Sequence, residues 1–153
     1  MPISSAGLED VPNFTGAKVS IAGAEAVREL VDASRGRLRV LCGDDRSALA
    51  ARAAGSVGMV TGAGTALPQP YVELADAIAA DDEARAGRAQ ELIDAFVEAT
   101  RGEIPLIKLA LKIQGLPGGA TRVSLPRPSG EDRRRLEAAI DAILGELGSP
   151  TPR

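Results

Sequence analysis

The chain has 153 residues, a net charge of −3 and no histidine. This length is enough to build a hydrophobic core, and the small excess of acidic side chains gives no reason to expect nucleic acid or an anionic membrane as a partner. The absence of histidine excludes a serine–histidine triad and removes the most common metal ligand and general base.

Only 2% of the residues are aromatic, so the core must be built from Ala, Val, Leu and Ile. The single cysteine, Cys42, has no partner for an internal disulfide, which fits a reducing compartment. We interpret it as a small core residue. The chain shows no signal peptide and no apolar run of about 18 residues. We therefore expect a soluble, cytoplasmic protein.

The first part of the chain predicts alternating strands and helices after a polar lead-in. Strands are expected at 14–20, 38–42 and 57–61, and helices between Gly23 and Gly36 and over about 46–54. The connections have the length that right-handed parallel crossovers require. Because the strands are continuous apolar runs, we expect a parallel sheet that is covered on both faces.

Lys18 is the most informative residue of the first strand. It shares a strand face with Gly16 and Ser20, because side chains alternate along a strand. Burial between Ala17 and Val19 would favour the neutral amine that attacks carbonyl groups. The alternative is a lysine whose stem lies on the apolar surface while its ammonium group reaches water.

Small and polar residues follow the other strands, at the edge where parallel α/β folds bind ligands. Asp44 and Asp45 have two competing interpretations, as a cap of the helix over 46–54 or as part of a metal site that lacks a third ligand. The segment Gly62–Gly64 has a weak likeness to a nucleotide loop, but the third glycine of that motif is missing.

Beyond Thr61 the pattern is helical. Helices are expected over about 70–80, 83–101 and 105–114, and a last helix opens at the capping box Ser129–Asp132. Asp81 and Asp82 are expected to separate the first two helices and to cap the second. Lys108 and Lys112 lie one turn apart, and we interpret them as one solvated helix edge. A Gly/Pro loop over 115–128 precedes the last helix.

Several stretches, in order and in register from about residue 10 to 146, resemble the dihydrodipicolinate synthase / N-acetylneuraminate lyase family. Residues 13–20 resemble the strand that bears its Schiff-base lysine, 40–45 the next strand with a Gly-Asp-Asp turn, and 55–61 the eighth strand. The C-terminal helical region of the family is matched by residues 104–108, 115–116 and 122–126. One departure is Ser124, which stands where the family has proline.

The resemblance implies an α/β fold that is only part of a (β/α)8 TIM barrel. The chain would supply the last three parallel strands with their helices, followed by the three-helix C-terminal extension of the family. The implied organisation is a lead-in over 1–13, a partial barrel over 14–64, a helical region over 65–148 and a tail over 149–153.

The resemblance also implies a class I aldolase or lyase in which Lys18 forms a Schiff base with pyruvate or a related 2-oxo acid, without a cofactor or metal. The implied substrate-binding residues are Ser20, Gly43, Asp44, Asp45, Val60 and Thr61. The family's carboxylate-binding loop and proton-shuttling tyrosine belong to the earlier strands, and nothing places Tyr71 in that role. We therefore expect the chain to be inactive alone.

Three parallel strands leave both sheet edges open. We therefore expect a homo-oligomer, or a companion chain that supplies the missing half barrel. The alternative function is a non-catalytic α/β assembly module that pairs with itself or with such a companion.

Overall fold

The computed structural model describes residue 11 and residues 13–148 of the chain. These residues form a mixed α/β fold with a three-stranded parallel sheet and six α-helices. The chain divides into two compact units, Met1–Thr61 and Gly62–Arg153. No helix in the described part is both long and apolar enough to cross a membrane.

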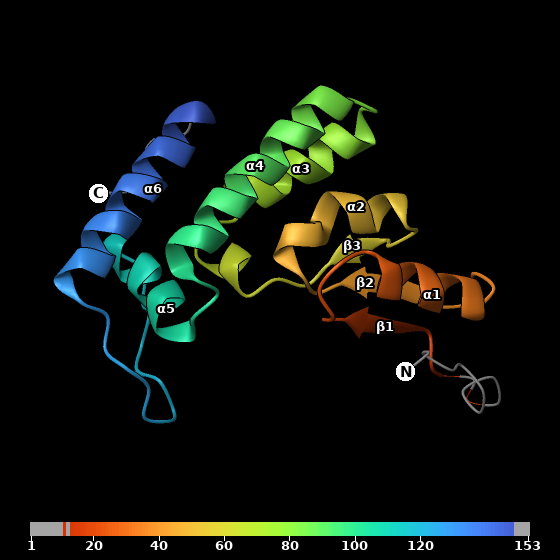
Figure 1. The fold of residues 1–153 in the computed structure, drawn as a ribbon, viewed down its shortest axis with the longest axis horizontal. Helices are drawn as coiled ribbons and strands as arrows, with labels where there is room; N and C mark the ends of the chain where they lie inside the picture. The colour runs from red at the N-terminus through yellow and green to blue at the C-terminus, as the bar shows by residue number, and fades with distance from the viewer. Residues whose placement is uncertain (1–10, 12, 149–153) are drawn as a thin grey trace. The chain divides into compact units, whose positions relative to one another are not determined.

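The first unit contains the sheet and two α-helices (Figure 1). In chain order its elements are β1 (Gly16–Val19), α1 (Glu25–Ala33), β2 (Arg39–Cys42), a 3-10 turn (Asp45–Ser47), α2 (Ala48–Ala53) and β3 (Gly58–Met59). The strand order is β1-β2-β3, so each strand is next to its successor in the chain. The strands are shorter than predicted, and only Gly58 and Met59 of β3 have paired positions on β2.

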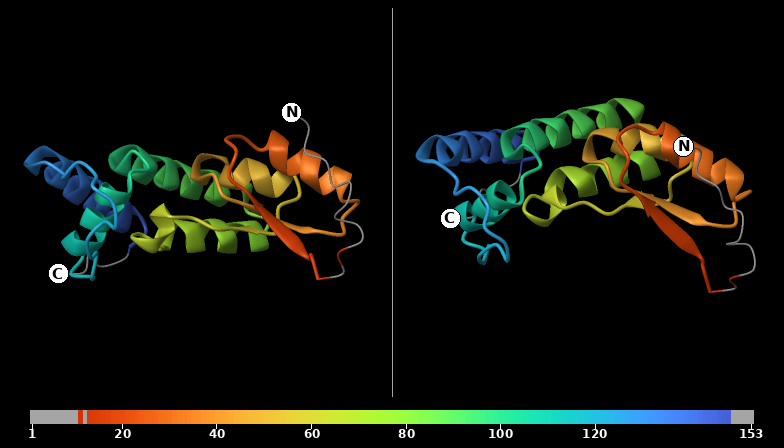
Figure 2. Two further views of the ribbon diagram at one scale, coloured as in Figure 1. Left: turned by 90° about the horizontal axis from the view of Figure 1, so that it is seen from below. Right: turned by 60° about the horizontal axis from the view of Figure 1, so that its bottom comes forward.

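Both helices of this unit cover the same face of the sheet (Figure 2). Their shared core consists of Val19, Val40 and Cys42 from the strands, Val27 and Leu30 from α1, Ala51 from α2, Ala54 directly after it, and Leu38. Helices on one face of consecutive parallel strands are typical of a (β/α) barrel wall, whereas a doubly wound sheet has helices on both faces. The unit therefore corresponds to part of a TIM barrel.

The prediction of a sheet covered on both faces is wrong for the described residues. On the face opposite the helices, Lys18, Arg39 and Gly58 are exposed and Leu41 is only half-buried. Three strands cannot close into a barrel, so no side chains from further strands fill the space in front of this face.

The second unit, over residues 62–148 that the structure describes, consists of a 3-10 turn and four α-helices. They are α3 (Gln69–Ala79), α4 (Glu83–Thr100), α5 (Ile104–Ile113) and α6 (Gly130–Glu146), after the 3-10 turn Ala63–Thr65. These bounds confirm the predicted helices to within about two residues, which is the usual uncertainty of helix ends. The helices α3 and α4 lie side by side (Figure 1), and the Arg85 guanidinium donates to both Glu73 carboxylate oxygens, at 2.5 and 2.8 Å.

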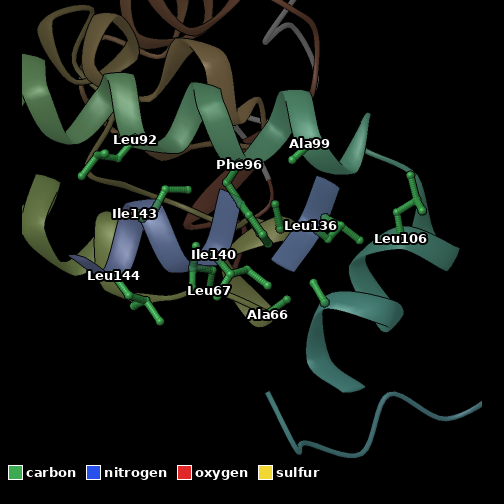
Figure 3. Close-up of a cluster of buried hydrophobic side chains, with 12 residues drawn as sticks. Ala66, Leu67, Leu92, Phe96, Ala99, Leu106, Leu136, Ile140, Ile143 and Leu144 are labelled. Atoms are coloured by element: carbon green, nitrogen blue, oxygen red, sulfur yellow. The ribbon is translucent and has the colours of Figure 1, made fainter. Parts of the chain in front are cut away.

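The core of the second unit is centred on Phe96, which is completely buried. Figure 3 shows its ring pointing from α4 toward α6, where Leu136 and Ile140 lie. Ala66 and Leu67 from the start of the unit and Leu106 from α5 belong to the same cluster. The helices α4, α5 and α6, together with the segment before α3, therefore form a core of their own.

Both predicted helix caps of this unit are confirmed. Asp82 accepts a hydrogen bond from the Arg85 backbone N–H at 3.0 Å. Ser129 Oγ accepts from the Asp132 N–H at 3.1 Å, and Asp132 Oδ2 accepts from the Ser129 N–H at 2.7 Å. The hydrogen bonds from Ser129, together with an ion pair to Arg135, hold the pKa of the Asp132 carboxyl well below its ordinary value of 3.8. The capping box is therefore also a charged cluster.

Candidate active site

The predicted site residues all lie in the first unit, where the sheet register aligns them. Lys18 of β1 is level with Leu41 of β2, which is level with Gly58 of β3. All three alternate with residues of the helix-facing core, so they belong to the open face of the sheet.

Two residues further along each strand, three predicted residues form a second row at the carboxyl ends of the strands. Ser20, Gly43 and Val60 each follow the residues paired at the last register position. Backbone hydrogen bonds continue this alignment, from the Gly43 N–H to the Val19 carbonyl at 2.7 Å and from the Val60 N–H to the Cys42 carbonyl at 2.8 Å. The structure therefore brings these residues together beside Lys18.

Gly43 leaves open the space that the Lys18 side chain occupies. A Cβ atom on Gly43 would overlap Lys18 Cε, would lie 2.6 Å from Ser20 Oγ, and would approach the Val19 carbonyl oxygen to 3.0 Å. The lysine chain therefore crosses from β1 over the end of β2, with the Ser20 hydroxyl next to it. Only glycine at position 43 is compatible with this arrangement.

Of the two interpretations of Lys18, burial between Ala17 and Val19 does not hold in this structure, because the side chain is exposed. The residue belongs to the open face of the sheet, so the alternative interpretation of a lysine that reaches water describes it better. Val60 is 46% exposed for the same reason, whereas Asp45 and Thr61 are half-buried.

Asp44 connects the loops that follow β1 and β2. Its Oδ2 accepts the Gly23 backbone N–H at 3.1 Å and also the Ser47 hydroxyl, and the Ser47 Oγ accepts the same Gly23 N–H at 3.1 Å. The helix-cap interpretation of Asp44 is wrong, since its side chain makes no capping hydrogen bond. It holds the loop after the lysine strand instead.

Sequence reasoning missed Gly23 and Ser47 as supports of this site. Gly23 has a φ of +91°, a conformation that favours glycine. The signal for Ser47 was weak, because a serine three residues after an aspartate is common in turns that have no function.

Cys42 is a core residue, as predicted, with 1% of its surface exposed. Burial raises the pKa of its thiol, and Sγ donates a hydrogen bond to the Asp44 carbonyl oxygen at 3.2 Å. The segment Gly62–Gly64 enters a 3-10 turn in which Ala63 is buried, rather than an open phosphate loop. In the described part of the chain, no group of three His, Cys, Asp or Glu side chains could hold a metal ion.

Comparison with known proteins adds independent information. The model of the dihydrodipicolinate synthetase family matches residues 2–143. The 4-hydroxy-tetrahydrodipicolinate synthase of Marinobacter nauticus is 33% identical over 140 residues, which cover 88% of this chain and 47% of that protein. The chain thus spans about half the length of this relative.

Solved structures also match this chain over about half of their own length. The sialic acid aldolase of Ruminococcus gnavus superposes with a TM-score of 0.82 and 25% identity, over 92% of this chain and 48% of that chain. A prophage protein of the dihydrodipicolinic acid synthase family from E. coli K12, solved in complex with pyruvate, has a TM-score of 0.73 and 19% identity over 86% and 46% of the two chains. Because the family model matches residues 2–143, which is most of this chain, the chain belongs to the dihydrodipicolinate synthetase family.

Proposed function

We propose that this chain is the C-terminal half of a lysine Schiff-base aldolase or lyase. It would supply strands six to eight of a (β/α)8 barrel over 14–64 and the C-terminal helical region over 65–148, between a lead-in over 1–13 and a tail over 149–153. The match to about half of each relative supports this proposal. The helices on a single face of the sheet support it as well.

Lys18 is the proposed Schiff-base residue, and the observation that carries this assignment is its path over Gly43 beside Ser20. The neutral amine would attack the carbonyl carbon of a 2-oxo acid, and water would leave as the iminium forms. The iminium then accepts the electron pair released when a neighbouring C–H or C–C bond breaks. Pyruvate is the proposed substrate class, in keeping with the pyruvate bound to the E. coli family member.

The remaining residues have proposed roles around this amine. Ser20 would orient the amine or a water molecule, while Gly43, Val60 and Thr61 would line the substrate pocket. Asp44 and Asp45 would contact the distal hydroxyl groups of a substrate. Since Asp44 Oδ2 already holds Gly23 and Ser47, its contact would use Oδ1.

We further propose that the chain is inactive until its open sheet face is covered. Desolvation is what favours the neutral amine of a lysine, and the exposed Lys18 has little of it. The missing strands, from a second copy or a companion chain, would supply this desolvation together with the carboxylate-binding loop and the proton shuttle.

Borohydride trapping with pyruvate tests the assignment. The chain is incubated with pyruvate and borohydride, alone and with a fragment of a family member that contains strands one to five, and adducts are located by peptide mass spectrometry. We expect one reduced adduct on Lys18 in the mixture, none in Lys18→Arg, and an unchanged adduct in the matched control Lys112→Arg. Adducts spread over Lys108 and Lys112, or no adduct in the mixture, would contradict the proposal.

A non-catalytic assembly module is the second candidate, and the sheet edges favour it. Among the described residues, β1 and β3 each pair with β2 alone, so their outer edges are available to another chain. Light scattering and crosslinking test this role. A well-folded monomer that does not bind the strand one to five fragment would rule it out.

A further inference from the structure

One segment of the second unit carries cationic side chains but no carboxylates. Between Glu103 and Glu131 there is no carboxylate side chain but there are four cationic ones, in a chain whose net charge is −3. Lys108 and Lys112 lie on α5, and Arg122 and Arg127 lie on the loop that leads from α5 to α6 (Figure 1).

These four residues surround one cavity of about 770 Å³, and Arg133 of α6 also lines it. A volume of this size is typical of sites for small molecules. Among the described residues, the cavity wall contains five cationic side chains and no aspartate or glutamate. The cavity therefore has an unbalanced positive charge.

Most of this charge is not neutralised by neighbouring side chains. Lys108 Nζ donates to the Gly118 carbonyl oxygen at 2.8 Å, a neutral acceptor that positions the ammonium at the start of the loop. This contact corrects the interpretation of Lys108 as a solvated residue, although Lys112 is exposed as predicted. Arg133 pairs with Glu137 at 2.8 Å, whereas Lys112, Arg122 and Arg127 form no ion pair with any residue that the structure describes.

The backbone of the loop provides further donors. From residue 118 to 127 no backbone N–H donates to another described residue, because this segment is neither helix nor strand. The hydroxyl groups of Thr121 and Ser124 also line the cavity. Free backbone N–H groups together with guanidinium forks are the donors that proteins use for phosphate groups.

We infer that this cavity binds a small anion with several negative charges, of phosphate chemistry. The positive charge of the wall favours an anion, and the number of separate cationic groups favours one with more than a single charge. The limited volume and the acidic remainder of the chain favour a small molecule over a nucleic acid. This site lies entirely within the second unit, so it does not depend on the proposed chemistry of Lys18.

Calorimetric titration of tripolyphosphate into the full chain tests the inference. We expect saturable binding to one site that weakens as sodium chloride is added. Arg122→Gln combined with Arg127→Gln should lower the affinity by about tenfold or more, because each change removes a charged hydrogen-bond donor. The matched control combines Arg28→Gln with Arg35→Gln, two exposed arginines of the first unit, and Lys18→Ala is a second control. Both controls should bind as the parent chain does, and circular dichroism should show that every variant is folded.

Three outcomes would overturn the inference. The first is the absence of saturable binding to the parent chain, and the second is an equal loss of affinity in the two double variants, which would indicate general attraction to net charge. The third is tighter binding of an oligoglutamate peptide than of tripolyphosphate, which would assign the cavity to an acidic protein segment.

Discussion

The two units of this chain differ in how completely they bury their own elements. The helical unit forms its core from α4, α5, α6 and the segment before α3, with Phe96 and Ile140 fully buried. The sheet unit buries Val40 of β2 completely. However, Arg39, which precedes Val40 in β2, and Lys18 of the paired strand β1 are both exposed. The helical unit therefore has the better-formed core, whereas the residues proposed for carbonyl chemistry lie on the open face of the sheet unit.

The largest expected effect is the loss of the Phe96 ring. Phe96→Ala should lower the free energy of unfolding by about 3–5 kcal/mol, because it removes a large buried side chain and leaves a cavity. Urea unfolding followed by circular dichroism measures this change. Val72→Ala serves as the control in the same unit, since Val72 is 57% exposed, and equal losses in the two variants would contradict a core centred on Phe96.

One glycine in each unit lies where an added Cβ atom would overlap a neighbouring residue. A Cβ on Gly118 would overlap the backbone carbonyl of Lys108, so Gly118→Ala should cost about 1–3 kcal/mol of stability. Gly43→Ala should cost less, because its Cβ would mainly meet the movable side chains of Lys18 and Ser20. Gly43→Ala should also slow borohydride trapping of pyruvate at Lys18 when the chain is mixed with the fragment that contains strands one to five. An unchanged rate of trapping would show that Gly43 does not position the amine.

A smaller effect is expected from the charged capping box. The pKa of Asp132 is lowered in the folded chain, so its contribution to stability is present above its ordinary pKa of 3.8 and is lost as the pH falls below that value. Asp132→Asn should therefore destabilise the chain at neutral pH, and its difference from the parent chain should shrink in acid. Urea unfolding at a series of pH values measures the stability of the variant and of the parent chain. A stability difference that does not depend on pH would contradict the lowered pKa of Asp132.

The smallest expected effect on stability is that of Lys18 itself. Lys18→Ala should change the free energy of unfolding by no more than about 0.5 kcal/mol, as is usual for an exposed side chain away from caps and cores. Thermal and urea unfolding of this variant would check the expectation. A large decrease in the free energy of unfolding would mean that Lys18 stabilises the fold of the sheet unit, which would contradict its assignment as an exposed residue with a chemical role.

The sequence alone determined the features that depend on local interactions. The order of strands and helices, the Asp82 cap and the Ser129–Asp132 capping box all follow from patterns within a few residues, and the structure confirms them. The shared strand face of Lys18 and Ser20 likewise follows from the alternation of side chains.

The sequence did not predict the exposure of Lys18 or the contacts of Asp44 and Lys108, which depend on residues distant in the chain. The exposure of Lys18 depends on whether other strands stand in front of its sheet face, which its own flanking residues cannot specify. The Asp44 carboxylate holds Gly23, 21 positions away, and Lys108 holds Gly118 across the turn of a loop. These contacts form only when separate segments are packed together, because hydrogen bonds and burial depend on distance in space rather than on distance in sequence.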